Sequence, residues 1–241
     1  MYISSTNSTN TLLKELIANG QTPEFLYTDY QTAGRGQTGN SWESEKGKNL
    51  LCSILLPPDK NLYFLNIAVG VAVYHTVQTV LQRSGLTAKR SYSEAVSVKW
   101  PNDIYWQDKK VAGILIENAI IGNEITYSIA GIGLNVSQTE WHSDAPNPVS
   151  LKQITGKDYD IERLMNRLLE AVHAVLNEPE QDVWAYYKAH LYRREGFWPY
   201  EDKNGQFLAR IKDTLPTGEI VLTDQQRKER IYHFKQIRYV I

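Results

Sequence analysis

Two short stretches of the chain carry residue types that bind phosphate. In the first, residues 34–42, three glycines, an arginine and a tryptophan alternate with polar residues. Glycine lets the backbone approach a ligand closely, exposed amides bind anions, and Arg35 adds a fixed positive charge with five donors. In the second, residues 99–103, a cation, an indole, an amide and a carboxylate lie close together. Together the two stretches predict a site for a charged, phosphate-bearing ligand.

The glycine-rich stretch does not belong to either common nucleotide fingerprint. Residues 34–39 fit the pattern G-x-G-x-x-G, but a dinucleotide site requires an apolar helix directly after the loop. Residues 40–48 are polar instead and contain no Gly-Lys-Ser/Thr of a P-loop. The sequence therefore predicts a long irregular loop with three cations, Arg35, Lys46 and Lys48. Such loops in compact domains are functional or disordered.

Outside these stretches, few residues are candidates for catalysis or metal binding. The five histidines share no i,i+4 spacing and have no acidic partner at ligand spacing, so no metal site is predicted. Cys52 lies in an apolar run and is interpreted as a buried apolar side chain. Lys110 lies at the mouth of a predicted hairpin, where a solvated lysine is the simplest interpretation of the pattern alone. Trp42, Trp100 and Trp106 could either join the core or pack on a ligand ring.

The composition is typical of a soluble globular protein. Of 241 residues, 42% are hydrophobic, and 26 basic against 27 acidic residues give a formal net charge of −1. This balance provides no field that would concentrate the protein on nucleic acid or a membrane. One cysteine cannot form an internal disulfide, no signal peptide is visible, and the apolar run at residues 50–57 is far shorter than a membrane span. A cytoplasmic protein without nucleic-acid or membrane partners is expected.

The hydrophobic pattern predicts an α+β fold. Helices are expected at residues 12–17, Leu62–Arg83, Ile161–Leu176 and 182–191, with a Ser/Thr/Asn cluster as the first N-cap and Gly20 and Gly85 ending the first two. Strands are expected at residues 25–30, Asn49–Leu56, 95–100, 104–106, 111–121 and 125–136, with connections at 84–94 and 137–150 and turns at 107–110 and 122–123. The consecutive hairpins predict a mixed, largely antiparallel sheet packed against helices.

From about residue 196 the pattern changes to short alternating strands. They are expected at residues 207–212, 219–223 and 230–241, separated by turns at 204–205 and 216–218. This pattern is typical of a small β-barrel-like domain, and about 45 residues is near the lower limit for independent folding. The smaller unit is therefore expected to rest on the larger one. We predict two domains, residues 1–194 and 195–241.

Five motifs in register resemble those of the biotin–protein ligases, also called biotin–[acetyl-CoA-carboxylase] ligases. They are Ser8-Thr9-Asn10, Gln31-Thr32-Ala33-Gly34-Arg35-Gly36 with Gly39 and Trp42, Lys99-Trp100-Pro101-Asn102-Asp103, the run KKVAGILIE from Lys109 to Glu117, and Gly131-Ile132-Gly133-Leu134-Asn135. Their order and spacing agree over about residues 8–136. The resemblance implies the catalytic fold of biotin and lipoyl ligases, which is like that of class II aminoacyl-tRNA synthetases, followed by an SH3-like β-barrel domain.

The resemblance also implies a two-step acyl transfer. The carboxylate of biotin attacks the α-phosphate of ATP with Mg²⁺ present, giving biotinyl-5′-AMP and pyrophosphate. A lysine of a biotin carboxyl carrier protein domain then takes the biotinyl group. Two anions must meet and the transition state gathers charge, so aligned cations and amides are the main catalytic need. No enzyme nucleophile is required, in agreement with a chain that shows no Ser-His-Asp or Cys-His arrangement.

Positions in the family motifs imply a role for each candidate residue. The catalytic set is Lys110 at the biotin carboxylate and α-phosphate, Arg35 closing over the adenylate, and Asp103 at phosphate, ribose or Mg²⁺ and as a candidate acceptor of the incoming lysine's proton. The biotin-binding set is Ser8, Thr9, Asn10, Gln31, Gly34, Arg35, Lys110, Gly113, Ile114 and Leu115. The ATP- and adenylate-binding set is Arg35, Gly36, Gln37, Trp42, Lys99, Asn102, Asp103, Lys110, Gly131, Gly133 and Asn135. No residue is assigned to a metal, because Mg²⁺ is expected to enter as its ATP complex.

The chain departs from the family pattern in two places. Many members carry arginines where this chain has Gln37 and Asn40, and a neutral contact in place of a charge-assisted one costs on the order of 1–2 kcal/mol, about tenfold in affinity. A looser hold on the adenylate is expected unless Lys46 or Lys48 compensates. Bifunctional relatives carry a winged helix-turn-helix before the Ser-Thr-Asn motif. Only seven residues precede Ser8, so a ligase without a repressor function is expected.

Three alternatives remain open from the sequence. A lipoate–protein ligase shares the fold and the chemistry, although the Lys-Trp-Pro-Asn-Asp motif favours biotin. A non-catalytic adenylate-binding sensor module would make Lys110 dispensable, and an oxidoreductase is disfavoured by the missing helix after Gly39. No motif indicates which carrier is modified or whether the protein is a monomer or a homodimer.

Overall fold

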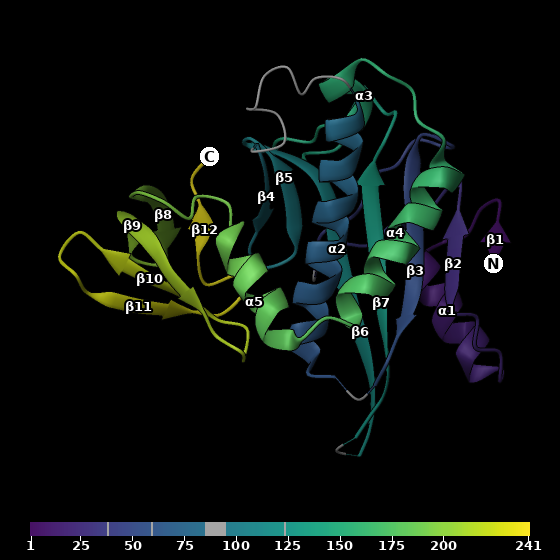
Figure 1. Ribbon diagram of the computed structural model, residues 1–241, viewed down its shortest axis with the longest axis horizontal. Helices are drawn as coiled ribbons and strands as arrows, with labels where there is room; N and C mark the ends of the chain where they lie inside the picture. The colour runs from purple at the N-terminus through teal and green to yellow at the C-terminus, as the bar shows by residue number, and fades with distance from the viewer. Residues whose placement is uncertain (38, 59, 85–94, 123) are drawn as a thin grey trace.

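Among residues 1–37, 39–58, 60–84, 95–122 and 124–241, which the computed structural model describes, the chain forms five helices and two sheets (Figure 1). The main sheet contains β1 (Tyr2–Ile3), β2 (Phe25–Thr28), β3 (Asn49–Leu56), β4 (Val96–Lys99), β5 (Asp103–Trp106), β6 (Lys109–Ile121) and β7 (Glu124–Asn135). The smaller sheet contains β8 (Trp198–Asp202), β9 (Gly205–Thr214), β10 (Ile220–Asp224), β11 (Glu229–Tyr232) and β12 (Arg238–Tyr239). The helices are α1 (Thr9–Ala18), α2 (Leu62–Arg83), α3 (Leu151–Thr155), α4 (Ile161–Leu176) and α5 (Glu180–Ala189).

The main sheet has the strand order β1-β2-β3-β7-β6-β5-β4. β1 pairs with β2 in parallel, and the other neighbouring pairs of these strands are antiparallel. The longest pair, β6 with β7, places Gly113 opposite Gly133 and Leu115 opposite Gly131. The prediction of a mixed, largely antiparallel sheet packed against helices is confirmed.

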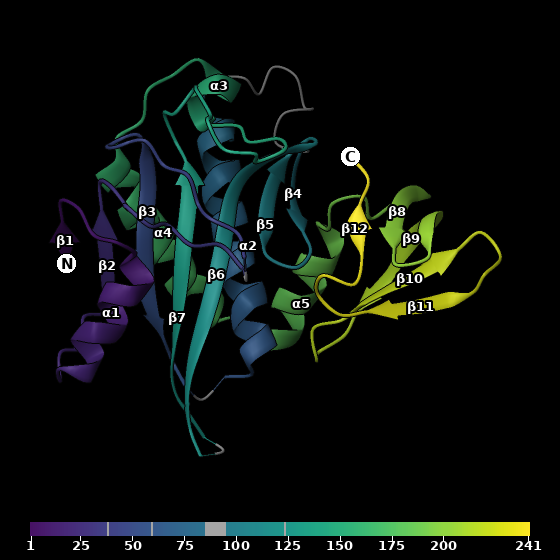
Figure 2. The same ribbon diagram turned by 180° about the vertical axis from the view of Figure 1, so that it is seen from behind.

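Helices cover both faces of this sheet (Figures 1 and 2). α2 and α4 lie on one face, whereas α1 lies on the other, against β2, β3 and β7. α2 has 22 residues and contains an 18-residue window with a mean hydropathy of 1.5, so by length and composition it could cross a membrane. The shorter apolar run at residues 50–57 does not indicate this helix. However, 78% of its apolar window is buried inside the protein, between the sheet and α4 and α5. α2 is therefore the central helix of the core.

Side-chain caps explain where the two long helices begin. Asn61 Oδ1 accepts hydrogen bonds from the backbone N–H groups of Tyr63 and Phe64 at the start of α2. Asp160 Oδ1 accepts one from the backbone N–H of Arg163 at the start of α4. Each cap pairs donors that have no partner within the helix. α4 also buries the apolar face that its periodicity predicts.

Several elements differ from the prediction. The two-residue strand β1, the five-residue helix α3 and the strand β8 have no counterpart in the sequence pattern. The strand predicted at residues 230–241 is two strands, β11 and β12, because the chain turns between them, with φ 68° at Lys235 and a bond from Gln236 N–H to His233 O. Gly85, most of the connection at 84–94 and residue 123 of the predicted turn lie outside the described residues.

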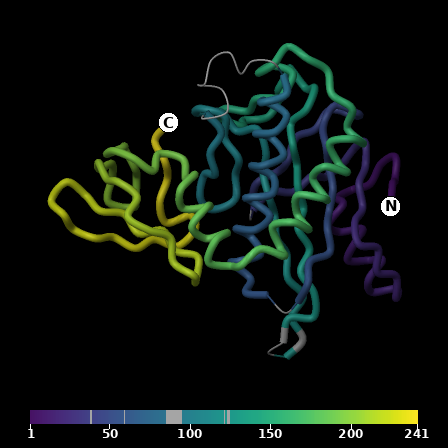
Figure 3. Tube along the Cα trace, in the orientation of Figure 1, coloured from purple at the N-terminus to yellow at the C-terminus, as the bar shows by residue number. Residues whose placement is uncertain are grey.

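The smaller sheet, ordered β11-β10-β9-β8-β12, lies beside the β4 edge of the main sheet (Figure 3). Trp100, directly after β4, is 2% exposed, and its Nε1 donates to Gly218 O at 3.0 Å while its ring contacts Phe234. Lys188 of α5 forms an ion pair with Asp213 of β9 at 2.6 Å. Buried side chains of the smaller sheet belong to the same apolar cluster as the main core. The two sheets therefore share a packed interface.

Candidate active site

A cavity of about 260 Å³ lies on the α1 face of the main sheet. The connection between β2 and β3 passes over β6 and β7 here (Figure 2). The walls come from the start of α1, from this connection, from strands β3 to β7 and from the segment between β11 and β12. Both stretches singled out by their chemistry thus face one space.

Lys110 lies at one end of the cavity, near the start of β6. Its Nζ is 2.7 Å from Asp103 Oδ1 and 5.4 Å from the centroid of the Trp42 ring. Its backbone N–H donates to Asn147 O at 2.8 Å, and its carbonyl accepts from Val149 N–H at 2.9 Å. A carboxylate and an aromatic face therefore orient the ammonium group, in contrast to the solvated lysine that the pattern alone suggests.

Trp42 packs at this end because the strands beneath it carry glycine. A Cβ added to Gly133 would lie 2.6 Å from Trp42 Cζ2, and one added to Gly113 would lie 2.8 Å from Trp42 Cζ3. Any larger residue at either position would displace the indole. Trp42 Nε1 is buried, with no hydrogen-bond partner among the described residues. Of the three tryptophans in question, Trp42 belongs to the cavity, whereas Trp100 is a core residue and Trp106 packs against the core.

Lys99 presents a second cation to the cavity. Its Nζ lies 4.7 Å from the centroid of the Tyr239 ring and 5.0 Å from that of Tyr105. Burial lowers the pKa of Lys99, and the nearby Asp103 carboxylate counters part of this effect. Aromatic faces attract a cation without using its N–H donors in hydrogen bonds, so Lys99 can still donate to an anionic ligand.

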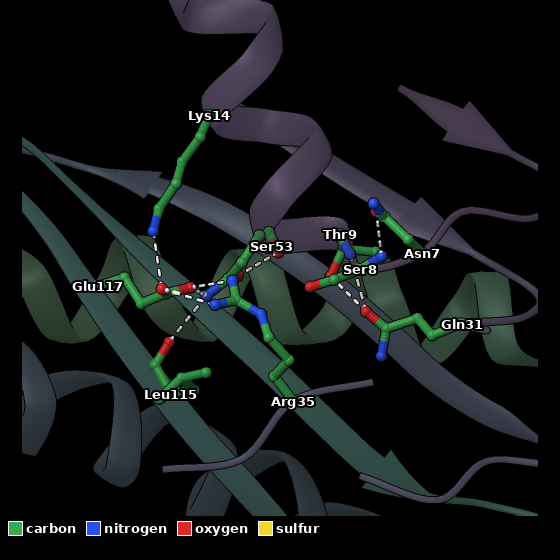
Figure 4. Close-up of polar contacts among 10 residues, drawn as sticks. Asn7, Ser8, Thr9, Lys14, Gln31, Arg35, Ser53, Leu115 and Glu117 are labelled. Carbon is green, nitrogen blue, oxygen red and sulfur yellow. Dashed lines mark hydrogen bonds and ion pairs between the residues drawn. The ribbon is translucent and has the colours of Figure 1, made fainter. Parts of the chain in front are cut away.

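Arg35 is bound to a carboxylate that the motif analysis does not assign to the site. Its Nη2 lies 2.7 Å from Glu117 Oε2, and its Nη1 lies 3.2 Å from Oε1 (Figure 4). Lys14 Nζ lies 2.7 Å from Glu117 Oε1, and Asn10 Nδ2 donates to Oε2 at 2.7 Å. Glu117 thereby joins the start of α1, strand β6 and the glycine-rich loop.

The polar cluster at the start of α1 faces the cavity. Ser8 occupies the N-cap position, but its side chain makes no capping hydrogen bond. The N–H and Oγ1 of Thr9 both donate to Gln31 Oε1, at 2.8 and 3.1 Å, and Asn10 Oδ1 accepts from Ser53 Oγ at 2.5 Å (Figure 4). The prediction of an N-cap in this cluster is confirmed by the position of Ser8, but the Ser8 side chain does not cap the helix through a hydrogen bond. The side chains of Ser8, Thr9 and Asn10 line the cavity.

Most of the residues implied by the family motifs line this cavity. They are Ser8, Thr9, Asn10, Gln31, Arg35, Gly36, Gln37, Trp42, Lys99, Asn102, Asp103, Lys110, Gly113, Ile114, Leu115, Gly131 and Gly133. Two others lie outside its lining: Gly34, whose carbonyl accepts from Trp42 N–H at 2.9 Å, and Asn135, which lies in an adjoining hollow and donates from Nδ2 to Val149 O at 3.2 Å. Asn102 lines the cavity, but its amide donates to Ile114 O and ties the turn before β5 to β6.

Several cavity neighbours lie outside the roles assigned from the motifs, among them Cys52, Phe234 and Glu117. Cys52 lines the cavity from β3, and burial raises the pKa of its thiol. Phe234 reaches the cavity from the segment between β11 and β12. No local signal indicates Phe234, because its position depends on how the two sheets pack. Glu117 could have been found, since strand alternation from Gly113 through Leu115 places it on the cavity face.

The two departures from the family pattern also lie at the cavity. Gln37 and Asn40 both line it, and Gln37 Oε1 is buried without a hydrogen-bond partner among the described residues. Lys46 and Lys48 are exposed and are not part of the lining. Neither lysine replaces the missing arginines in this arrangement.

The arrangement suits the binding of an anionic, phosphorylated ligand. Within the described residues, three cations (Arg35, Lys99 and Lys110) and one carboxylate (Asp103) line the cavity. Fixed cations stabilise negative charge that develops on phosphate and carboxylate oxygens. The described residues contain no group of three or more His, Cys, Asp or Glu that could hold a metal ion. Asp103 is the lining residue that could contact a cation carried by a phosphate ligand.

Comparison with known proteins agrees with the motifs. The model of the biotin/lipoate A/B protein ligase family matches residues 2–135. The bifunctional ligase/repressor BirA of Escherichia coli (strain K12) is 28% identical over 196 residues, covering 79% of this chain and 57% of that protein. BirA of Bacillus subtilis (strain 168) is 31% identical over 176 residues, covering 70% of this chain and 51% of that protein. The chain thus spans about half the length of these curated relatives.

The architecture also matches a solved structure. The biotin protein ligase from Aquifex aeolicus, in complex with biotin and ATP, superimposes with a TM-score of 0.79 and 24% identity, covering 100% of this chain and 98% of that one. At this identity the likeness shows a shared fold. The family match shows more than the fold, because it covers more than half of the chain and includes all five motifs. The chain belongs to the biotin/lipoate A/B protein ligase family.

Proposed function

We propose that the chain is a biotin–protein ligase. It activates biotin with ATP to biotinyl-5′-AMP and transfers the biotinyl group to a lysine of a biotin carboxyl carrier protein domain. The observation that carries this proposal is the Lys110–Asp103 pair at 2.7 Å, in one cavity with Arg35 and Lys99. The family match supports it, as do relatives named ligase/repressor and a fold neighbour solved with biotin and ATP.

In the first step a carboxylate oxygen of biotin attacks the α-phosphorus of ATP, and the bond to pyrophosphate breaks. Lys110 draws the two anions together, and Lys99 holds phosphate oxygens. Because both reactants are negative, fixed cations lower the barrier by neutralising charge in the transition state. Thr9 and Gln31, which are hydrogen-bonded to each other at 2.8 Å, present polar atoms to the ureido ring of biotin.

In the second step the amine of the acceptor lysine attacks the carbonyl carbon of the mixed anhydride, and AMP leaves. The amine must first lose a proton, since lysine is normally protonated at neutral pH. Asp103 is the carboxylate within the lining that can accept this proton. Arg35 and the glycine-rich loop exclude water, which would otherwise hydrolyse the anhydride.

The lining residues fit a Mg²⁺ ion that arrives on the phosphates of ATP. Asp103 offers a hard oxygen donor, which this cation prefers, and Mg²⁺ sites commonly combine one or two carboxylates with substrate phosphates. When bound, the ion neutralises phosphate charge. Asp103 would hold it while Lys110 and Lys99 contact the remaining phosphate oxygens.

We extend the proposal to the whole molecule. Residues 1–194 form the ligase domain and residues 195–241 a small β-domain that packs against it through Trp100 and Phe234. The protein acts in the cytoplasm as a monomer or homodimer, on a carrier domain of acetyl-CoA carboxylase or a related carboxylase. It needs neither nucleic acid nor a membrane for this reaction.

A lipoate–protein ligase is the second candidate, because the matching family includes lipoate ligases. ATP–pyrophosphate exchange, measured with either biotin or lipoate as the acid, distinguishes the two candidate functions. A site that hydrogen-bonds the ureido ring rejects an analogue without it, so exchange with biotin should exceed that with lipoate by at least about a hundredfold. Exchange with lipoate alone would favour the second candidate, and exchange with neither would overturn both.

A further inference from the structure

Arg35 is engaged at one end of the cavity, away from the other cations. Both terminal nitrogens of its guanidinium contact Glu117, which lies two residues beyond Leu115 on the cavity face of β6 (Figure 4). Lys110, by contrast, lies beside Gly113, with its Nζ 3.1 Å from the position of an added Cβ. The two cations are therefore distributed along the length of β6.

The spacing of β6 sets the distance between these two positions. Gly113 and Glu117 are four residues apart, which is about 13 Å at roughly 3.3 Å per residue. Oxygens of a single phosphate group cannot contact cations at both ends of such a span. A phosphate beside Lys110 can therefore gain Arg35 only if the guanidinium leaves Glu117.

We propose that Glu117 is a positioning residue that competes with the adenylate phosphate for Arg35. This inference rests on the proposed ligase function. Arg35 has two alternative partners, the carboxylate of Glu117 and the phosphate beside Lys110. The partition between them sets how firmly biotinyl-5′-AMP is retained. A ligand that binds one of two arrangements shifts the population toward it, and a competing arrangement weakens its apparent affinity.

If Arg35 leaves, the Glu117 carboxylate still has other partners. Lys14 Nζ at 2.7 Å and Asn10 Nδ2 at 2.7 Å both remain on the carboxylate. Asn10 is itself fixed by Ser53 through the 2.5 Å bond to its Oδ1. A buried carboxylate that loses its only partner is strongly disfavoured, whereas one that keeps a cation and an amide is not.

Glu117 is a carboxylate rather than a neutral acid in this network. Burial alone raises the pKa of Glu117, but hydrogen bonds from Lys14 and Asn10 and the charges of Lys14 and Arg35 outweigh burial and leave that pKa below its ordinary value. The pair with Arg35 is thus ionic at neutral pH. Its strength can be changed by altering either Glu117 or Lys14.

Dissociation of labelled biotinyl-5′-AMP, formed in the protein from biotin and ATP, tests the proposal. Glu117→Gln keeps the shape of the side chain but removes the charge that competes for Arg35, so dissociation should slow about two- to fivefold. Lys14→Met removes the other cation on Glu117 and tightens its hold on Arg35, so dissociation should become faster. Faster dissociation in Glu117→Gln would overturn the proposal, because Glu117 would then support the bound arrangement.

An Arg35→Ala background shows whether the effect passes through Arg35. In that background Glu117→Gln should leave the dissociation rate unchanged, since the competing cation is gone. A purely structural role of Glu117 would change the rate equally in both backgrounds. That result would overturn the proposal.

Limited trypsin digestion gives a readout that needs no catalysis and serves if a variant is unstable. Cleavage after Arg35, followed by mass spectrometry, should increase in Glu117→Gln and decrease in Lys14→Met. Absence of exchange in the wild-type chain would overturn the proposed function and this inference with it. An active wild-type enzyme whose variants change neither cleavage nor dissociation would overturn this inference alone.

Discussion

In the described part of the chain, three cations line one cavity, and a different interaction holds each of them. Lys110 contacts the carboxylate of Asp103, Lys99 lies against aromatic rings, and Arg35 is paired with Glu117. A carboxylate partner limits how a cation binds a ligand, because the ligand must either displace the carboxylate or share the cation with it. Among the described residues, Lys99 lies against aromatic rings rather than a carboxylate, so its N–H groups can bind a ligand. In the proposed mechanism, Lys110 and Arg35 would exchange partners during the reaction.

Gln37 provides a test of how firmly the adenylate is held. Its Oε1 is buried without a hydrogen-bond partner among the described residues, at a cavity position where the family motif implies an arginine. Gln37→Arg adds a charge-assisted contact, on the order of 1–2 kcal/mol, so biotinyl-5′-AMP should dissociate about tenfold more slowly. Gln37→Met, which removes the amide without adding charge, is the matched control. An unchanged rate in Gln37→Arg would contradict this account.

The Glu117 network makes stability depend on pH in a defined direction. The folded-state pKa of Glu117 lies below its ordinary value of 4.5. The network therefore stabilises the folded state above pH 4.5, and this contribution is lost as the pH falls through the lowered pKa. The difference in thermal unfolding midpoint between the wild type and Glu117→Gln should be present at pH 7 and shrink below pH 4.5. A difference that is independent of pH would contradict the network.

Motifs predicted the composition of the cavity better than the contacts within it. Lys110 and Asp103 appear seven residues apart in the sequence, and their pairing follows from the β5–β6 hairpin. The partner of Arg35 did not follow, because Arg35 lies on an irregular loop whose side-chain direction no periodicity specifies. Asn135 was expected at the ligand, but its amide is used to fix the backbone at Val149.

Strands β6 and β7 form the floor of the cavity because they carry glycine where other elements approach. Gly113 and Gly133 accommodate Trp42, and Gly131 accommodates Asn10. Glycine in a strand interior weakens the strand but allows close approach of another group. The absence of side chains at these three positions thus allows the loop and α1 to pack closely on the sheet.

Gly131 is the position where an added methyl group would act most directly on α1. A Cβ there would lie 2.5 Å from Oδ1 of Asn10. Ser53 donates to this Oδ1, and Asn10 Nδ2 donates to Glu117, so the side chain is fixed on both sides. Gly131→Ala should displace the start of α1 and weaken biotin binding at least about tenfold, as measured by calorimetric titration. Gly70→Ala in α2, where the nearest atom would be 3.7 Å away, is the control and should bind as the wild type does. Normal biotin binding by Gly131→Ala would show that α1 does not form the biotin pocket.

Long periodic elements were predicted well and short ones were not. α2, α4 and β3 occupy the residue ranges that hydrophobic periodicity indicates. β1 has two residues and exists because it pairs with β2, a tertiary contact that no local pattern contains. The same reason applies to β12, which is two residues long and pairs with β8.

The two sheets share one apolar core and are also joined by specific contacts. Trp100, at the end of β4, donates a hydrogen bond to the smaller sheet's side of the interface. Phe234, in the connection between β11 and β12, lines the cavity. A domain near the lower size limit gains stability from such packing. The sequence pattern predicted a change to short alternating strands near residue 196. It did not predict the interface, which depends on residues far apart in the chain.

Trp100→Phe tests the contribution of this interface. The change removes the donor to Gly218 O in a buried contact, so the free energy of unfolding in urea should fall by about 1–2 kcal/mol. Trp198→Phe is the control, because Trp198 Nε1 also donates to a backbone carbonyl, Glu195 O at 2.7 Å, but the residue is 39% exposed. Its loss should be smaller. Equal losses in the two variants would contradict an interface that stabilises the whole chain.

The ligase proposal as a whole depends on Lys110 acting at the carboxylate and the α-phosphate. The most direct measurement is biotin-dependent ATP–pyrophosphate exchange by the wild type, by Lys110→Ala and by Lys109→Ala, whose exposed side chain is not part of the cavity lining. We predict exchange that requires biotin in the wild type and Lys109→Ala, and a loss of about a hundred- to a thousandfold in Lys110→Ala. Full exchange in Lys110→Ala, or none in the wild type, would contradict the account.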